Sequence, residues 1–279
     1  MKISKFQQLR IFGKGMSSSP RLWMYSPNNS PDPLPSSAVL FTQTEVITLN
    51  SPVMPNQDKI DLEGLRKFVG NHQTNDGKKV SDFIDIENSR PLLIAGELAN
   101  PYRLCDISAP SLPIIPVRME NICRTWADNL DPRDVNPGVH HVTVVRSPGW
   151  WEMSYITLME PKEMKRIVQW LDGNTPNTWA PKRLAEGIIR LESDYSIKSP
   201  SIDDITWDGI EEKVNVELPK PNGPELDLST IIVPINTRSG CYNSRGRVIR
   251  CQHISHKEFH DNLFRRGSSF LWSDLLNVL

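Results

Sequence analysis

Ile205-Thr206-Trp207-Asp208 opens the stretch that sets the expected fold, which extends from Asp204 to Asp274. Apolar residues then alternate at Val214, Val216 and Leu218, the period-2 pattern of a half-buried strand. The basic run Ser244-Arg245-Gly246-Arg247-Val248-Ile249-Arg250-Cys251 has a central glycine and is typical of a hairpin. The stretch therefore predicts paired strands, and it contains no catalytic motif.

A helix is expected after this hairpin, because the chain there carries helix-start signals. Ser255 and Glu258 have the spacing of a capping box, in which each side chain accepts the other residue's backbone N–H. Ile254 and Phe259 occupy the apolar staple positions around that start. Gly267 is suitably placed to end the helix.

Four further helices are predicted upstream, from apolar residues spaced three or four apart. The first covers Lys59 to Val69, and two others begin at Pro161 and Pro181. Proline suits the first helical position, where a backbone N–H has no partner within the helix. The fourth helix is predicted from one apolar stripe: Met119, Ile122, Cys123, Trp126 and Leu130.

Strands are predicted between these helices. Val39 to Leu49 has a strand-like pattern, and residues 139–146 and 153–159 are expected to pair as a hairpin around Ser147-Pro148-Gly149. Trp150 and Trp151 would then mark the tip of that hairpin. These elements together predict an α+β fold, with an antiparallel sheet packed against several helices. We expect one domain, residues 38–279, preceded by a flexible, basic, Ser/Pro-rich arm at residues 1–37.

Length and composition are those of a globular protein. A chain of 279 residues is long enough to bury a substantial core. No apolar run approaches the roughly 20 residues that a membrane-spanning helix needs, and no secretory signal is expected at the N-terminus. The four cysteines are scattered and form no disulfide framework, which indicates a reducing compartment.

The formal net charge of −1 conceals two basic ends on an acidic body. Residues 1–30 contain five Lys or Arg and no acid, and residues 238–266 contain seven Lys or Arg with two acids. Such poles favour an anionic partner, membrane or nucleic acid, or self-association. At the C-terminal pole, ordinary solvated charge is an equally good interpretation.

Residues 1–14 are expected to bind anionic membrane lipid. Apolar residues at positions 3, 6, 9 and 12 alternate with cations, as in a helix that lies at a lipid surface. A terminal helix packed on the body is the alternative. The expected membrane-binding residues are Lys2, Lys5, Phe6, Arg10, Phe12 and Lys14.

Two other groups of residues are expected to contact a partner. Trp23 and Tyr25 lie in a short apolar segment within the otherwise polar arm, which indicates docking on a partner or neighbouring subunit. The arginines of the C-terminal pole are expected to bind a protein partner or nucleic acid: Arg245, Arg247, Arg250, Arg265 and Arg266.

Metal and catalytic sites are not expected. Cys251, His253, His256 and His260 are weak candidates for zinc, since His256 and His260 are four residues apart on one helical face. However, no Cys-x2-Cys pair accompanies them, and polar histidines at a helix start are the more frequent interpretation. No nucleophile–base set and no phosphate-binding loop is present, so we predict no enzyme activity and no cofactor.

The Asp204–Asp274 stretch resembles the C-terminal part of rhabdovirus matrix proteins, especially those of the lyssavirus branch. The similarity lies in Ile205–Asp208, the strand at 214–218, a Gly246-Arg247-Val248 strand flanked by cysteines, and Leu271–Asp274. It covers less than a third of the chain. The late-domain motifs of that family are absent, and Pro35-Ser36-Ser37-Ala38 only approaches one, which puts recruitment of host budding factors in doubt.

This resemblance implies a non-enzymatic viral matrix protein with an antiparallel sheet packed on helices. Such a protein coats the inner face of the virion envelope, condenses the nucleocapsid and drives assembly and budding. Its implied partners are anionic membrane lipid, the viral nucleocapsid and further copies of itself. Its implied location is the virion inner face, the host cytoplasm and the membrane periphery.

A second hypothesis belongs to a different functional class. The chain could be a viral nucleic-acid-binding or movement-type protein that contacts RNA through its basic C-terminal region. An enzyme is the third and least favoured class.

Overall fold

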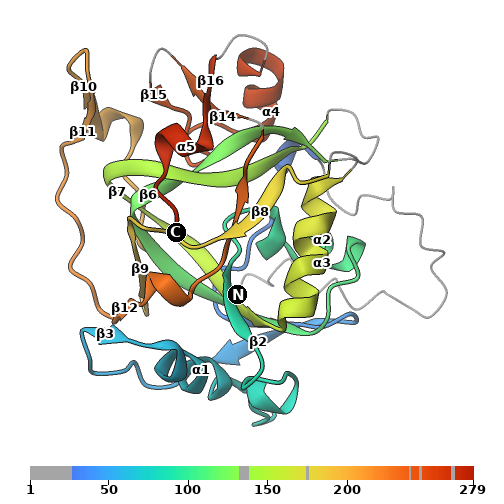
Figure 1. Ribbon diagram of the computed structural model, residues 1–279. Coiled ribbons are helices and arrows are strands. Elements are labelled where there is room, and N and C mark those ends of the chain that lie inside the picture. The colour runs from blue at the N-terminus through green and yellow to red at the C-terminus, as the bar shows by residue number, and fades with distance from the viewer. Residues whose placement is uncertain (1–26, 132–137, 174–175, 239, 245–246, 265–267) are drawn as a thin grey trace, which may run out of the picture.

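Two long antiparallel strands, β6 (Leu112–Leu130) and β7 (His140–Met159), form the centre of the protein. The computed structural model describes residues 27–131, 138–173, 176–238, 240–244, 247–264 and 268–279 (Figure 1). β6 pairs with β7 along most of its length and also with three shorter strands, so the sheet grows outward from it. The sheet curls into a half-barrel around the core.

The main sheet has twelve strands. Besides β6 and β7 they are β1 (Val39–Phe41), β2 (Val46–Asn50), β3 (Lys59–Ile60), β4 (Gln73–Thr74), β5 (Arg90–Leu93), β9 (Ile188–Leu191), β12 (Glu225–Leu226), β14 (Gly240–Ser244), β15 (Arg247–Val248) and β16 (Ser268–Leu271). β3 pairs with β12 in parallel, whereas β6, β7 and their neighbours pair antiparallel. Two separate pairs complete the strands: β8 (Trp179–Lys182) with β13 (Val233–Asn236), and β10 (Ile205–Trp207) with β11 (Glu212–Val214).

The helices are few and short, so the predicted α+β class is wrong. The described α-helices are α1 (Leu62–Gly70), α2 (Pro101–Asp106), α3 (Pro161–Asp172), α4 (His256–Glu258) and α5 (Trp272–Leu275). Short 3-10 turns are η2 (Pro27–Asn29), η3 (Val80–Asp82), η4 (Glu97–Ala99), η5 (Ile202–Asp204) and η6 (Leu228–Thr230), and η7 (Phe259–Leu263) is a π-helical turn. The protein is mostly β, and a curled mixed sheet replaces the expected sheet packed against several helices.

The stripe that predicted a helix at Met119–Leu130 belongs to strand β6. Its apolar residues do recur at helical spacing, but polar residues between them are buried as well, including Glu120, Arg124 and Thr125. A strand that is covered on both faces loses the alternation of apolar and polar residues. The apolar pattern alone therefore did not distinguish a helix from a buried strand here.

The predicted hairpin at residues 139–159 is instead one continuous strand. Ser147-Pro148-Gly149 forms a bulge in β7, opposite a register shift at Asn121 of β6. Asn121 and Gly149 both have positive φ, and the Gly149 N–H donates to Asn121 Oδ1 at 2.9 Å. The turn-forming residues thus bend the strand and do not reverse it. Trp150 and Trp151, expected at the tip of that hairpin, lie within β7 and are buried.

Several local predictions hold and others do not. The helix predicted from Lys59 begins at Leu62. Asp61 is its N-cap, and the Asp61 side chain accepts a hydrogen bond from the Gly64 N–H. The helix at Pro161 is confirmed, with Gly173 at its C-cap. The helix predicted at Pro181 is wrong, since the chain there forms strands β8 and β9.

The core lies on both faces of the sheet. Leu40 and Val117 face a cluster that also buries Leu65 and Phe68, which places α1 on that face. Other apolar residues of β1 and β6 face a second cluster that includes Met164, Ile167, Val168 and Leu171 of α3. Because apolar residues cover the sheet on both sides, charged residues within its strands are buried with it.

Part of the predicted arm packs on the body. The Asn100 side chain donates to the Pro31 carbonyl at 2.8 Å, and the Tyr155 hydroxyl donates to the Pro35 carbonyl at 2.6 Å. Ser30 and Pro31 are buried. Residues 27–37 are therefore part of the folded unit, and the prediction of a flexible segment at residues 1–26 lies outside the described residues.

The burial of Trp150 generates a stability prediction. Replacing Trp150 by Ala should cost about 3–5 kcal/mol, because the change removes a large, fully buried side chain. Trp207→Ala, at a partly exposed position, is the control and should cost far less. Unfolding in urea measures the free energy of unfolding of both variants. Equal losses would contradict the burial of Trp150 within the continuous strand.

Candidate functional site: the β10–β11 hairpin and its anchors

The β10–β11 hairpin projects from the main sheet (Figure 1). Ile205 pairs with Val214 and Trp207 pairs with Glu212. Its turn is held by the Asp208 carboxylate, which accepts the N–H groups of Ile210 and Glu211, both at 2.9 Å. Gly209 in the turn has φ of 102°, a conformation that a residue with a Cβ adopts only with strain.

Exposed apolar side chains are concentrated on and beside this hairpin. Five of the nine large exposed hydrophobic residues in the described chain lie within residues 202–218, and the side chain of Ile210 is 87% exposed. The five are Ile202, Trp207, Ile210, Val216 and Leu218. This concentration of exposed apolar residues along one short segment makes the hairpin a candidate contact site for another molecule.

The hairpin is also acidic. Between residues 203 and 217 there are six carboxylates and a single cation, Lys213. Hydrogen bonds from the N–H groups of Glu211 and Ile210 lower the pKa of Asp208, and those from Ser201 lower the pKa of Asp204. Both groups therefore stay charged at neutral pH. The exposed surface combines apolar area with negative charge.

Arg250 anchors the hairpin to β7. Its guanidinium donates to Glu212 of β11 and to the Ser147 hydroxyl, both at 2.7 Å, and it stacks over the Trp150 ring. Arg250 is 4% exposed. We predicted a partner- or nucleic-acid-binding role for Arg250. The structure instead places its side chain inside the protein, in contact with the Glu212 carboxylate and the Trp150 ring.

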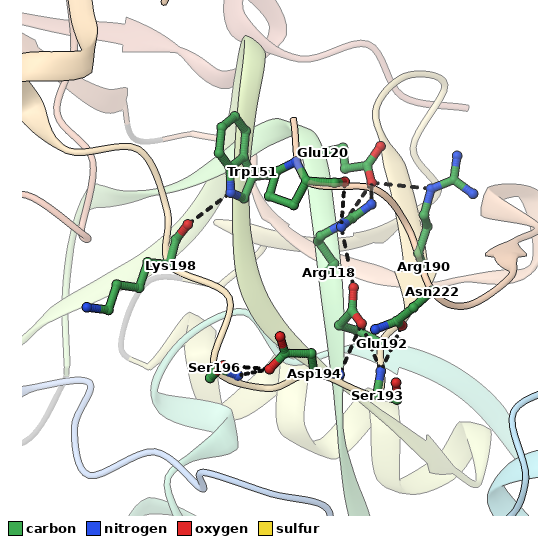
Figure 2. A network of polar contacts seen from close by, with 11 residues as sticks. Arg118, Glu120, Trp151, Arg190, Glu192, Ser193, Asp194, Ser196, Lys198 and Asn222 are labelled. Carbon is green, nitrogen blue, oxygen red and sulfur yellow. Dashed lines mark hydrogen bonds and ion pairs between the residues drawn. The ribbon is translucent and has the colours of Figure 1, made fainter. Parts of the chain in front are cut away.

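A second anchor holds the chain on either side of the hairpin (Figure 2). Before the hairpin, the Trp151 indole N–H donates to the Lys198 carbonyl at 2.9 Å. After it, the Arg118 guanidinium donates to the Pro219 carbonyl at 3.1 Å. The hairpin is thus tied to the central strands at its base, on both sides.

Arg118 is the centre of a buried ionic network (Figure 2). Its guanidinium lies 2.5 Å from Glu120 and 3.4 Å from Glu192, and Arg190 lies 3.2 Å from Glu120. Glu192 also accepts the N–H groups of Ser193 and Asp194. A fully buried arginine is tolerated only when carboxylates and hydrogen bonds compensate its lost hydration. The network therefore supports the structure.

The other predicted binding residues are placed as follows. Arg247 of β15 is exposed, and it pairs in register with Ser244 of β14. Asn243 pairs with Val248 on one side and with Ser268 on the other. The remaining residues lie outside the described part of the chain: Lys2, Lys5, Phe6, Arg10, Phe12, Lys14, Trp23, Tyr25, Arg245, Arg265 and Arg266.

The four weak zinc candidates do not converge on one point. His253 lies 2.9 Å from the Pro200 carbonyl and packs against Trp150. His256 and His260 turn instead toward His140 of β7. Cys251 is linked through its backbone N–H to the Arg124 carbonyl. Among the described residues no group of three or more His, Cys, Asp or Glu has the geometry of a metal site.

Hydrogen bonds occupy four of the six ring nitrogens in the cluster of His140, His256 and His260. His256 Nε2 accepts the His140 backbone N–H at 3.1 Å. His140 Nδ1 lies 3.3 Å from the Ala127 carbonyl and must donate to it, so His140 Nε2 accepts from His260 Nδ1 at 3.2 Å. These two Nε2 lone pairs are therefore not available to a metal. From the sequence we expected His140 and His141 to lie on opposite faces of a strand, but not that His140 contacts His256 and His260, because nothing local links position 140 to the C-terminal segment.

The Arg118 network generates a prediction about buried charge. Arg118→Met should destabilise the protein by about 3–5 kcal/mol, since the buried Glu120 and Glu192 would lose the guanidinium that compensates their burial. The control is Arg146→Met, which breaks the partly exposed pair with Glu186 and should cost less than about 1 kcal/mol. Urea unfolding distinguishes the two, and a small effect at Arg118 would contradict a supporting role.

The histidine cluster predicts loss of stability in acid. Burial, with the neighbouring His256, lowers the pKa of His140 to about 3, and burial, with His260, lowers that of His256 to about 4, although Glu97 and Asp261 oppose the latter. Both histidines are neutral when folded but protonate near pH 6.5 when unfolded. Their stabilisation is complete above pH 6.5 and is lost as the pH falls toward 4.

The measurement is the free energy of unfolding at pH 7 and pH 5. Each buried neutral histidine should contribute a loss of about 2 kcal/mol at pH 5. His256→Gln keeps a hydrogen-bond acceptor but cannot titrate, so it should remove one such contribution from the pH dependence. Carboxylates elsewhere affect both proteins equally. An unchanged pH dependence in the variant would show that His256 is not the titrating group.

Comparisons with protein-family models, with curated proteins and with solved structures give no match. Within the described residues, no helix is both long enough and apolar enough to cross a membrane. The function must therefore be argued from the chemistry of the chain itself.

Proposed function

We propose that this chain is a non-enzymatic viral matrix-type protein, which binds anionic membrane through residues 1–14 and assembles through protein contacts of its body. One observation carries the proposal: the β10–β11 hairpin exposes apolar side chains, and the bond from Arg250 to Glu212 anchors it to the body. An assembly protein needs such a surface, because exposed apolar area drives association. Further copies of the chain and the viral nucleocapsid are the proposed partners.

The membrane part of the proposal is supported by the N-terminal sequence. Residues 1–14 contain four cations and no acid, with apolar residues between them. Each cation near an anionic membrane surface contributes roughly 1 kcal/mol, and inserted apolar side chains add to this. These properties favour the inner membrane face as the location, with the host cytoplasm before assembly.

The interior of the body favours a structural role over catalysis. The buried arginines in β6 are paired with carboxylates: Arg118 with Glu120, and Arg124 with Glu152. A groove of about 770 Å³ beside α3 is lined mainly by apolar side chains such as Met164, Val168 and Ile232. These features suit packing and protein contact, and no nucleophile–base pair lines the groove.

The fold lends no support to the rhabdovirus resemblance, which implied a sheet packed against helices. The proposal therefore depends on the basic arm and the hairpin. RNA binding by the C-terminal arginines is the alternative, and the burial of Arg250 removes one of its five expected contacts.

A paired experiment tests membrane against RNA binding. Replacing Lys2, Lys5, Arg10 and Lys14 together by Gln should weaken binding to acidic liposomes at low salt by about 1,000-fold, the equivalent of roughly 4 kcal/mol. Neutral liposomes should bind weakly in every case. Flotation measures the binding, and the chain stays full-length so that the body is unaltered.

The matched variant is Arg245→Ala with Arg247→Ala, which leaves the buried Arg250 in place. It should float like the unaltered protein. If flotation instead survives loss of the four N-terminal cations, while the arginine variant loses salt-sensitive RNA binding, the nucleic-acid class is correct and the matrix proposal fails.

A further inference from the structure

The β10–β11 hairpin is an incomplete sheet. Its two strands pair with each other, β11 packs beside β7, and the described residues supply no third strand. A two-stranded hairpin alone is marginally stable in water, and the outer edge of an exposed strand can pair with an added segment. Here β11 is the anchored strand, so β10 offers the open edge.

The surface chemistry of the hairpin defines what would cover it. Trp207 and Ile210 offer apolar area, while Asp203, Asp208 and Glu211 are exposed carboxylates nearby. A second hairpin of the same kind would bring like charges together, which opposes self-pairing. The fitting partner is an apolar segment that carries positive charge.

The first 14 residues of the chain have this composition. They contain four cations, no acid, and apolar residues at every third position from Ile3 to Phe12. Charge and apolarity therefore complement those of the hairpin. Residues 15–30 contain a single cation, Arg21, so the positive charge of the N-terminal end is concentrated in residues 1–14.

The point where the described chain begins lies near the base of the hairpin. η2 (Pro27–Asn29) packs beside α4 (His256–Glu258), and His253, just before α4, bonds to the carbonyl of Pro200, just before the hairpin. Residues 15–26 span up to about 40 Å when extended. The tether is thus long enough for residues 1–14 to reach the hairpin of the same molecule, at a high effective concentration.

We propose that residues 1–14 dock in cis on the open edge of β10, with their cations facing the hairpin carboxylates. The same residues contact lipid in the proposed function, so docking and membrane binding exclude each other. This regulatory consequence depends on the proposed function, whereas docking itself depends only on the hairpin and the arm.

The test measures how fast trypsin cleaves the full-length protein after Lys5, Arg10 and Lys14. In the variant Ile210→Ser with Glu211→Lys, cleavage should be at least about tenfold faster, a factor equivalent to about 1.4 kcal/mol. The control is Val53→Ser with Glu87→Lys, which makes the same changes at exposed positions outside the hairpin. The control should be cleaved like the unaltered protein.

Three outcomes decide the inference. Equal cleavage in both variants overturns docking. If protection from trypsin increases with protein concentration, docking in cis is overturned, because residues 1–14 then dock on another copy of the chain. Faster cleavage in the hairpin variant only, at all concentrations, supports it, and that variant should also float on acidic liposomes at lower lipid content. If cleavage differs as expected but no variant floats, docking stands and the proposed membrane function fails.

Discussion

The antiparallel pairing of β6 with β7 is the constraint on which the rest of the structure depends. The pair extends from Ile115 opposite Ile156 to Leu130 opposite His140, and apolar residues cover both of its faces. Burial on two faces gives the pair its stability through the hydrophobic effect. It also removes the charged residues of these strands from water, so each of them needs a partner inside the protein.

The partners of the buried charges come from distant parts of the chain. Arg118 binds Glu192 and the Pro219 carbonyl, and Arg250, a residue beyond β15, binds Glu212 at the edge of the hairpin. The segment between residues 192 and 222 is therefore fastened to the central strands at several points. The interactions that compensate the buried charges of Arg118 and Arg250 thus also hold the hairpin in place at the surface. The stability of the body and the position of the candidate contact site depend on the same contacts.

The C-terminal segment is fastened by neutral contacts. Phe259 packs against Trp126 and Tyr242, and His256 accepts the backbone N–H of His140. These contacts close one end of the half-barrel and place α4 beside η2, where the described chain begins. η2 and α4 are in this way brought together near the hairpin anchor, although the sequence separates them by more than 200 residues.

Local signals were sufficient for some elements. Pro161 with Gly173 and the glycine-centred basic run each act within a few residues, and the structure forms a helix and a strand pair there as expected. The helix predicted from Lys59 begins only at Leu62, after its N-cap Asp61. Two of the exposed apolar residues beside the hairpin, Val216 and Leu218, belong to the alternation that predicted a half-buried strand. Only the fold shows that nothing among the described residues covers them.

By itself, then, the sequence determined the two longer helices, the uneven charge, and the extended character of residues 39–49, which form the paired strands β1 and β2 and not the single strand predicted. Tertiary structure alone decided that β6 is a strand, that β7 continues as one strand through a bend at Pro148-Gly149, and that Arg250 is buried. The reason is physical. Caps and turns depend on neighbours in the chain, whereas burial on two faces and the pairing of a buried charge depend on residues that only folding brings together.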